Sequence, residues 1–139
     1  MAAVERWSIV ILDLDPVVGH EQAGRRRALV VSYEPFHRSG MATVCPITSR
    51  APKYPGEIAV PAGHAGQTLD GAILVHQIRT IDVRRLTAAI IGGAAQTVTD
   101  PAIRRDVRRA LAHHLGLDVP TAADGAAPAL VPATDRVTD

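Results

Sequence analysis

Five short apolar runs rich in β-branched residues constrain the fold of this chain more than any other feature. They span residues 7–14, 28–33, 42–47, 57–60 and 72–81. Runs of this length, bounded by proline, glycine and polar residues, are typical of β-strands. The first ends at Asp15-Pro16, because proline has no amide donor and disfavours helix in the residue before it. We expect the second and third runs to pair as antiparallel neighbours, and residues 90–92 to close the sheet.

A helix is predicted near the other end of the chain. Asp100 is placed to cap it, Pro101 suits its first turn, and Gly116 ends it. Its apolar stripe consists of Ile103, Val107, Ala110, Leu111 and Leu115. Beyond residue 117 the chain is rich in Ala, Pro, Thr and Asp and poor in large apolar residues. We therefore expect a mainly β domain with a C-terminal helix over residues 1–117, and a flexible tail over residues 118–139.

Composition narrows the possible functions. A chain of 139 residues is of single-domain size. Its net charge of +1 produces no strong overall field, so any case for a nucleic-acid partner rests on local clusters of arginine. Cys45 is the only cysteine, which leaves no disulfide within the chain and favours a reducing cytoplasm. No apolar stretch approaches the ~20 residues of a membrane span, and no glycine-rich phosphate loop supports nucleotide-driven chemistry.

The segment 19–27 combines proton-transfer groups with phosphate-binding groups. It contains His20, Glu21 and the run Arg25-Arg26-Arg27, which we expect to share one loop between the first two strands. Guanidinium groups bind phosphate oxygens through two parallel hydrogen bonds, and His and Glu commonly move protons near neutral pH. The alternative is a solvated basic turn in which Glu21 neutralises one arginine.

Polar residues also interrupt two later strands. Thr48 and Ser49 end the third, and the strand over 72–81 carries His76, Gln77 and Arg79 on its alternating faces. An exposed sheet face would explain this pattern, but in a small antiparallel barrel these places converge with the 19–27 loop on one mouth. Guanidiniums, hydroxyls and proton-transfer groups without a clear metal-ligand set indicate metal-free phosphodiester chemistry. RNA suits it, because its 2′-hydroxyl supplies the nucleophile.

Four pieces of the chain, in order and spacing, resemble the MazF/PemK (Kid-like) toxins of bacterial toxin–antitoxin systems. They are LDLDPVVGHEQ at residues 12–22, the strand at 26–32, VCPITS at 44–49 and QIRTID at 77–82. With the helix ending in Leu115-Gly116-Leu117, the resemblance covers nearly everything before the tail, so residues 1–117 look like one toxin domain.

The resemblance implies an SH3-like β-barrel, similar to MazF and CcdB, that forms a homodimer and binds single-stranded RNA in a groove. It implies a cytoplasmic, sequence-specific endoribonuclease that needs no metal or other cofactor, leaves 2′,3′-cyclic phosphate and 5′-hydroxyl ends, inhibits translation and is neutralised by a cognate MazE-like antitoxin. Arg26 matches the family's transition-state arginine and Thr48 its hydroxyl residue, while His20 and Glu21 match assisting proton-transfer positions. Expected RNA-binding residues are Arg25, Arg27, Gln22, Ser49, His76, Gln77 and Arg79.

Two departures leave alternatives open. Arg27 stands where the family usually has proline, so Arg25 or Arg27 could share the catalytic role, or Arg27 could pair with Glu21. His76 and Leu74 replace an aspartate and an arginine, respectively, of the Kid branch, so its acid–base arrangement cannot be transferred intact. The competing functions are a non-catalytic toxin that grips a protein, as CcdB-like gyrase inhibitors do, and a protein that only binds RNA or antitoxin.

Overall fold

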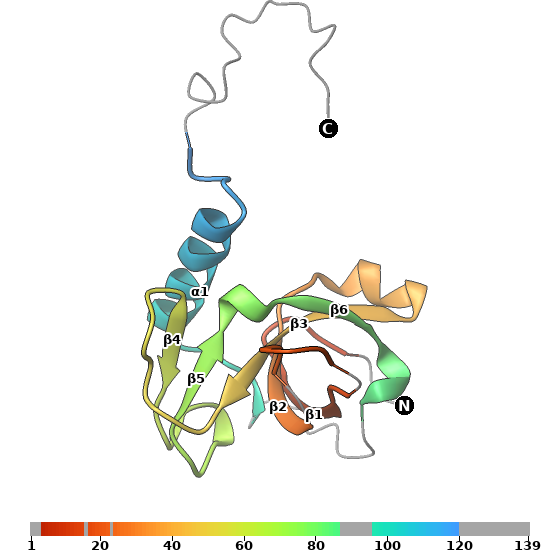
Figure 1. Ribbon diagram of the computed structural model, residues 1–139, viewed down its shortest axis with the longest axis horizontal. Helices are drawn as coiled ribbons and strands as arrows, with labels where there is room; N and C mark the ends of the chain where they lie inside the picture. The colour runs from red at the N-terminus through yellow and green to blue at the C-terminus, as the bar shows by residue number, and fades with distance from the viewer. Residues whose placement is uncertain (1–3, 16, 23, 87–95, 120–139) are drawn as a thin grey trace, which may run out of the picture.

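The computed structural model describes residues 4–15, 17–22, 24–86 and 96–119 (Figure 1). The strands are β1 (Ile9–Asp13), β2 (Arg25–Val30), β3 (Met41–Thr48), β4 (Glu57–Val60), β5 (Gly71–Leu74) and β6 (Arg79–Asp82), and the α-helix is α1 (Pro101–His114). Short 3₁₀ segments are η1 (Glu34–Ser39), η2 (His64–Gly66), η3 (Val75–Gln77) and η4 (Val83–Arg85). None of the described helices is both long and apolar enough to cross a membrane.

The strands form one antiparallel sheet in the order β1-β2-β3-β5-β4. The long strand β3 organises it, because one edge of β3 pairs with β2 while the other pairs first with β6 and then with β5. An isolated bridge between Leu12 and Leu86 brings the chain after β6 back to β1. The helix α1 lies to one side, next to β4 (Figure 1).

Both faces of the central strands are buried, because alternating side chains enter two different apolar clusters. Ile9, Leu29, Cys45 and Ile47 lie in the first cluster, which Ile103 and Val107 of α1 complete. The second cluster consists of Val4, Val10, Leu12, Leu14, Ala28, Val30, Ala42, Val44 and Ile81. Burial raises the pKa of the Cys45 thiol to about 12, so this cysteine stays protonated and acts as a small core residue.

The predicted helix is confirmed. Oδ1 of Asp100 accepts a hydrogen bond from the amide of Ala102 at 2.8 Å, and Pro101 occupies the first turn. Beyond its C-terminus, Gly116 adopts a φ of 74°, a left-handed conformation that glycine tolerates best. The expected apolar stripe stops short of Leu115, whose side chain is 56% exposed at the C-cap.

The expected single strand over residues 72–81 is wrong. The 3₁₀ segment η3 divides it into β5 and β6, which pair with different parts of β3. The strict alternation predicted for His76, Gln77 and Arg79 therefore fails at Val75. The second expected run also starts earlier than predicted, at Arg25, and ends at Val30. The candidate strand at residues 90–92 and the tail from residue 120 onward lie outside the described residues.

A buried carboxylate organises the connection between β3 and β4. Glu57 accepts two hydrogen bonds from the Arg50 guanidinium, at 2.7 and 2.9 Å, and a third from the amide of Lys53 at 2.7 Å. Its side chain is fully buried, whereas that of Arg50 is 33% exposed. The Arg50 hydrogen bonds, assisted by the Lys53 amide, lower the pKa of Glu57 to about 2. This pair holds the turn that precedes β4.

Candidate functional site

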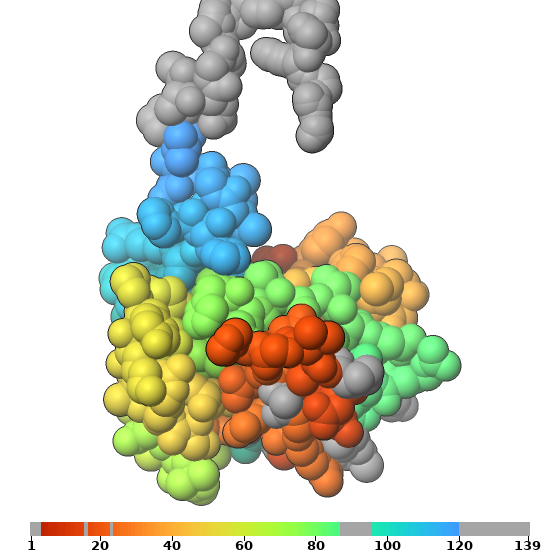
Figure 2. Space-filling view, viewed as in Figure 1, coloured from red at the N-terminus to blue at the C-terminus, as the bar shows by residue number. Residues whose placement is uncertain are grey.

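The loop between β1 and β2 lies against the η3–β6 segment. Oε1 of Gln77 accepts the amide hydrogen of Gln22 at 2.6 Å, and Nε2 of Gln77 donates to the carbonyl of His20 at 3.4 Å. At the start of the loop, the Arg79 guanidinium donates to the carbonyl of Leu14 at 3.1 Å. Figure 2 shows the red-orange residues of this loop lying across the green residues near β6. Gln77 and Arg79 therefore hold the loop from below.

A cleft of about 520 Å³ opens between this loop and η3. The lining residues are His20, Glu21, Gln22, Pro46, His76, Gln77, Ile78 and Arg79. The structure thus brings six of the residues predicted from sequence into one concavity: His20, Glu21, Gln22, His76, Gln77 and Arg79. They come from two segments more than fifty positions apart in the chain, which explains why a polar loop and an interrupted strand belong together.

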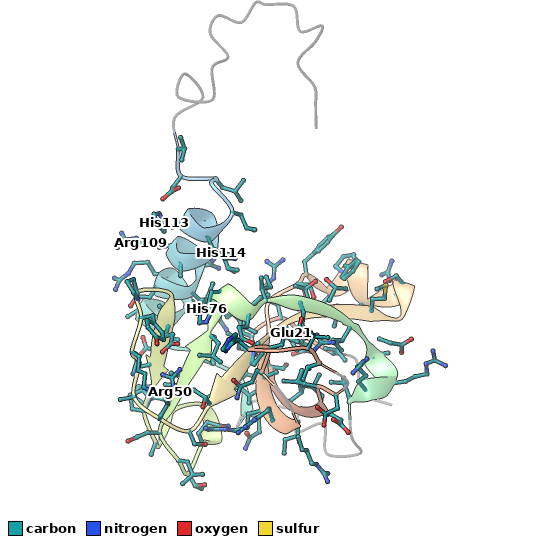
Figure 3. The ribbon with its side chains drawn as sticks, viewed as in Figure 1. Glu21, Arg50, His76, Arg109, His113 and His114 are labelled. Carbon is teal, nitrogen blue, oxygen red and sulfur yellow. The ribbon has the colours of Figure 1, made fainter. Side chains whose placement is uncertain are left out.

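The Glu21 carboxylate also shapes the loop. Its Oε1 accepts the amide hydrogen of Val18 at 2.6 Å, and the amide of Glu21 donates to the carbonyl of Val18 at 3.2 Å. His20 and Glu21 are both exposed on this turn. Glu21 and His76 line the same cleft, and their labels lie near each other in Figure 3. The loop therefore presents an imidazole and a carboxylate to the solvent side of the cleft.

Arg26 and Thr48 occupy neighbouring positions on two adjacent strands. Arg27 pairs with Ile47 in the β2–β3 ladder, so the next step of that antiparallel register sets Arg26 opposite Thr48. Their side chains point to the same face of the sheet as Pro46, which lines the cleft, because strand side chains alternate. Arg26 is exposed and Thr48 is half-buried. A guanidinium and a hydroxyl thus share one face beside the cleft.

The three consecutive arginines do not share a loop, contrary to the expectation from sequence. They begin β2, so Arg25 and Arg27 point to the face opposite Arg26. The half-buried Arg27 donates hydrogen bonds to the Ser49 hydroxyl and to Gln67, at 3.2 and 3.0 Å. Burial lowers the pKa of its guanidinium, which remains charged at neutral pH. The structure shows no ion pair between Arg27 and Glu21, two residues that it describes, so that alternative is wrong.

A family model described as the PemK-like, MazF-like toxin of type II toxin–antitoxin systems matches residues 5–115. The chain belongs to this toxin family. Endoribonuclease toxin ChpB of Escherichia coli K12 is 39% identical over 104 residues, which cover 73% of this chain and 89% of that relative.

Solved structures agree with this assignment. The crystal structure of MazF from Deinococcus radiodurans is 31% identical with a TM-score of 0.68, and the match covers 84% of this chain and 99% of that one. A crystal structure of MazE–MazF from the same organism is 26% identical with a TM-score of 0.62, covering 84% and 98%. The predicted resemblance is confirmed, as is the mainly antiparallel β fold with a C-terminal helix.

Sequence reasoning missed the groups that anchor the toxin's loop at its base. The Arg85 guanidinium donates to the carbonyl of Asp15 at 2.7 Å, and Oδ1 of Asp15 accepts the amide hydrogen of Gly24 at 3.1 Å. Arg85 and Asp15 lie 70 positions apart in the chain. No local pattern signals such a contact, although the adjacent Asp15-Pro16 does signal the turn itself.

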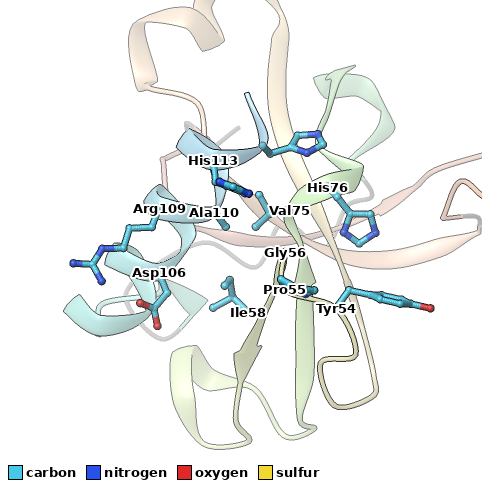
Figure 4. Close-up of a pocket in the computed structure, with 11 residues that line it drawn as sticks. Tyr54, Pro55, Gly56, Ile58, Val75, His76, Asp106, Arg109, Ala110 and His113 are labelled. Carbon is cyan, nitrogen blue, oxygen red and sulfur yellow. The ribbon is translucent and has the colours of Figure 1, made fainter. Parts of the chain in front are cut away.

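The toxin has a second cavity, of about 680 Å³, between α1 and the β4–η3 region (Figure 4). Ile58, Val75 and Ala110 form part of its apolar floor, and His113 and Arg109 of α1 lie at its edge. His76 lines both cavities and so forms part of the wall between them. Among the described residues, no group of three or more His, Cys, Asp or Glu side chains is placed to share a metal ion.

Proposed function

We propose that this toxin is a sequence-specific endoribonuclease that cleaves single-stranded RNA without a metal ion. One observation carries the proposal: Arg26 and Thr48 lie on the face of the sheet that carries Pro46, beside the cleft that His20 and Glu21 line. Two groups that can bind a phosphate therefore lie next to two that can move protons, which supports the proposal. The relative ChpB is an endoribonuclease toxin, which supports the same chemistry here.

The reaction is an internal transfer at phosphorus. The 2′-hydroxyl oxygen of RNA attacks the adjacent phosphorus, and the bond from phosphorus to the 5′-oxygen breaks. The products are a 2′,3′-cyclic phosphate and a 5′-hydroxyl. Arg26 donates hydrogen bonds to the phosphoryl oxygens as negative charge builds on them, and the Thr48 hydroxyl adds a further donor.

Proton transfer falls to the loop. In this proposal the Glu21 carboxylate accepts the proton of the 2′-hydroxyl, and His20 protonates the leaving 5′-oxygen. The amide of Val18 orients the carboxylate through Oε1 at 2.6 Å, which leaves Oε2 as the atom facing the substrate. Gln77 holds the backbone on both sides of Glu21, at the carbonyl of His20 and the amide of Gln22, so the two groups keep their separation.

The substrate is single-stranded because sequence-specific reading of RNA requires unpaired bases that can be splayed apart. Gln22 and His76, which line the cleft, are the side chains that we assign to RNA contacts. Arg25 and Ser49, expected from sequence to share this role, lie with Arg27 on the other side of the sheet, so the proposal gives them no contact with the RNA in the cleft. Gln77 and Arg79 support the RNA-binding surface through the loop that they hold. Loss of RNA by cleavage then inhibits translation in the cytoplasm.

The assembly proposed is a homodimer of SH3-like barrels neutralised by an antitoxin. The Leu12–Leu86 bridge supports closure of the sheet, and the crystal structure of MazE–MazF supports an antitoxin of the MazE type. We assign the apolar cavity beside α1 to the second copy, since Ile58, Val75 and Ala110 form its floor and the exposed Leu115 and Leu117 follow the helix. Sedimentation of the wild type and of Ala110→Asp tests this assignment: the wild type should be dimeric and the variant monomeric.

Cleavage of a long single-stranded RNA in excess EDTA tests the proposed reaction. Wild-type protein, Arg26→Ala and Arg105→Ala are compared, and the chemical ends of the fragments are determined. We expect discrete fragments with cyclic-phosphate and 5′-hydroxyl ends from the wild type and from Arg105→Ala, whose side chain is exposed on α1. Arg26→Ala should give none. A folded wild type that leaves RNA intact would favour the non-catalytic alternative, a toxin that grips a protein target.

A further inference from the structure

Both terminal nitrogens of the Arg27 guanidinium are fully hydrogen-bonded within the chain. Its Nη1 donates to Oε1 of Gln67 at 3.0 Å and to the carbonyl of Leu69 at 3.4 Å. Its Nη2 donates to the Ser49 hydroxyl and to the carbonyl of Asp70, both at 3.2 Å. The two terminal nitrogens of a guanidinium carry two hydrogens each, so these four bonds use all of them. A phosphate would have to displace at least one of these acceptors to bind Nη1 or Nη2.

The acceptors of Arg27 are themselves held in place. Gln67 is buried, and its Nε2 donates to the carbonyl of Ala65 at 3.0 Å and to Oε1 of Gln96 at 2.8 Å. Oδ1 of Asp70 accepts the amide hydrogen of Ala62 at 2.8 Å, which closes the β4–β5 connection at its base. Arg27 is therefore bound to a loop that is itself held by hydrogen bonds. These contacts fix the position of β2 at Arg27.

Gly71, the first residue of β5, makes room for the guanidinium. A Cβ atom at this position would lie 2.8 Å from Nη2 of Arg27 and 2.8 Å from Cγ2 of Ile47, closer than real Cβ contacts come. The backbone of β5 thus packs directly against the Arg27 side chain. This close approach supplies a second way to disturb Arg27 without removing its charge.

Every segment that Arg27 joins leads directly to the proposed catalytic pair. Arg27 follows Arg26 in β2, and Ser49 follows Thr48 at the end of β3. Asp70 precedes β5, whose Ala72 pairs with Thr48. The guanidinium therefore ties together the three strand ends around Arg26 and Thr48, from the opposite face of the sheet.

We propose that Arg27 is a positioning residue that sets the spacing of Arg26 and Thr48 from behind the sheet and makes no contact with RNA. This inference rests on the proposed function, and it gives Arg27 a role other than the RNA contact expected from the sequence. A positioning role and an RNA-binding role differ in the kinetic constant that they control. Misplacing Arg26 and Thr48 slows the chemical step and lowers kcat. Losing a phosphate contact instead weakens RNA binding, which raises KM and reduces the dependence of binding on salt.

The test measures kcat and KM at several salt concentrations, on a short single-stranded RNA that carries the site cut by the wild type. The variants are Arg27→Met, Arg27→Lys and Gly71→Ala, with Arg105→Met as the matched control for loss of charge. We expect kcat to fall about tenfold or more in Arg27→Met and in Gly71→Ala, with KM and its salt dependence as in the wild type. Arg27→Lys keeps the charge but cannot reach four acceptors, so its kcat should also fall.

Several outcomes would overturn the inference. A raised KM with wild-type kcat and a salt slope smaller by about one in Arg27→Met, restored by Arg27→Lys, would make Arg27 an RNA-binding residue instead. If Arg27→Met fails to fold, a wild-type kcat in both Gly71→Ala and Arg27→Lys would still overturn the inference. Absence of cleavage by the wild type would defeat the proposed function and this inference with it, whereas active wild type with unaffected variants would defeat the inference alone.

Discussion

Arg26 and Arg27 are neighbours in sequence with the same chemistry, yet the two faces of β2 give them opposite surroundings. Arg26 is exposed beside the cleft, opposite Thr48, whereas the half-buried Arg27 donates hydrogen bonds to four acceptors on the other face. The Arg50–Glu57 pair resembles Arg27 in this respect, since its carboxylate is fully buried and hydrogen-bonded. The comparison teaches that the face and the burial of a charged group, rather than its residue type, separate function from architecture here.

This comparison makes a general prediction that experiments can contradict. Substitutions on the cleft face should change cleavage and leave the free energy of unfolding near its wild-type value. Substitution of the Arg50–Glu57 pair should change the free energy of unfolding first. Arg27 stands between the two classes, because it is tied into the architecture yet lies directly behind the proposed catalytic pair.

The largest effect is expected from Arg26→Lys, which keeps the charge but loses the planar fork of donors. Cleavage should slow by roughly 10²-fold, the low end of the loss measured when one donor to developing charge is removed. The thermal midpoint should stay within a degree or two of the wild type, since the side chain is exposed. Single-turnover cleavage and calorimetry measure the two quantities, with Arg105→Lys as control. Wild-type cleavage by Arg26→Lys would remove Arg26 from the reaction.

Glu57→Gln should produce the opposite pattern. Breaking this pair should lower the free energy of unfolding by about 3 kcal/mol, the low end for a buried pair because Arg50 remains 33% exposed. Denaturant unfolding measures the loss, and Glu5→Gln, on an exposed residue, is the control. Cleavage measured well below the midpoint should be unchanged. A loss of cleavage without a loss of stability would show that Glu57 belongs with the site.

The same variant predicts a pH dependence. The folded pKa of Glu57 is about 2, below the usual value of 4.5, so its contribution to stability is present above about pH 4.5 and is lost as pH falls toward 2. The difference in unfolding free energy between the wild type and Glu57→Gln should therefore shrink across this window. A difference that stays constant from pH 5 to pH 2 would contradict the ion pair. Using the difference removes the parallel titration of Asp82, whose pKa Arg84 also holds at about 2.

The parts of the fold that sequence predicted correctly are those set by local chemistry. The strand Glu57–Val60 and the helix capped by Asp100 appear as expected, because apolar periodicity and capping residues act within a few positions. The η3 turn within residues 72–81 carries no glycine or proline to reveal it. It forms because β3 offers separate pairing segments to β5 and β6.

The candidate site divides in the same way. The residue types at the cleft were predictable, since His20, Glu21 and Gln77 lie in the pieces of sequence that resemble the toxin family. The placement of Arg26 and Arg27 on opposite faces of the sheet was not predictable, because it depends on β2 starting at Arg25, opposite Asp13 of β1. The acceptors of Arg27 include backbone carbonyls more than 40 residues away, and any residue type supplies a carbonyl. Sequence patterns therefore indicated the chemistry of the site but not the face on which each group lies.

A smaller effect on the cleft face is expected from Thr48→Val, which preserves the branched shape and removes the hydroxyl. Cleavage should slow by about tenfold, because the hydroxyl is a secondary donor beside Arg26 and a tenfold loss corresponds to about 1.4 kcal/mol. Thr43→Val is the matched control, since Thr43 lies on the same strand and its hydroxyl bonds to that of Thr80 at 2.8 Å. Equal cleavage by both variants would return Thr48 to a purely structural role in β3.

The smallest effect on the free energy of unfolding is expected at the N-terminal cap of α1. Asp100→Ala removes the cap of α1, so the free energy of unfolding should fall by about 1 kcal/mol, whereas Asp100→Asn keeps a capping oxygen and should cost only a few tenths. Denaturant unfolding resolves the two, and both variants should cleave RNA at the wild-type rate, because Asp100 lies outside the cleft. The helix α1 completes the apolar cluster on the face of β2 to which Arg27 points. Fraying the first turn of α1 therefore tests whether that face as a whole controls cleavage. If Asp100→Ala slows cleavage as much as Gly71→Ala does, the effect belongs to general loosening of this face. If only Gly71→Ala slows it, the control is local to the contacts of Gly71 with Arg27, Ile47 and Thr48, and the Arg27 variants then separate the part due to Arg27.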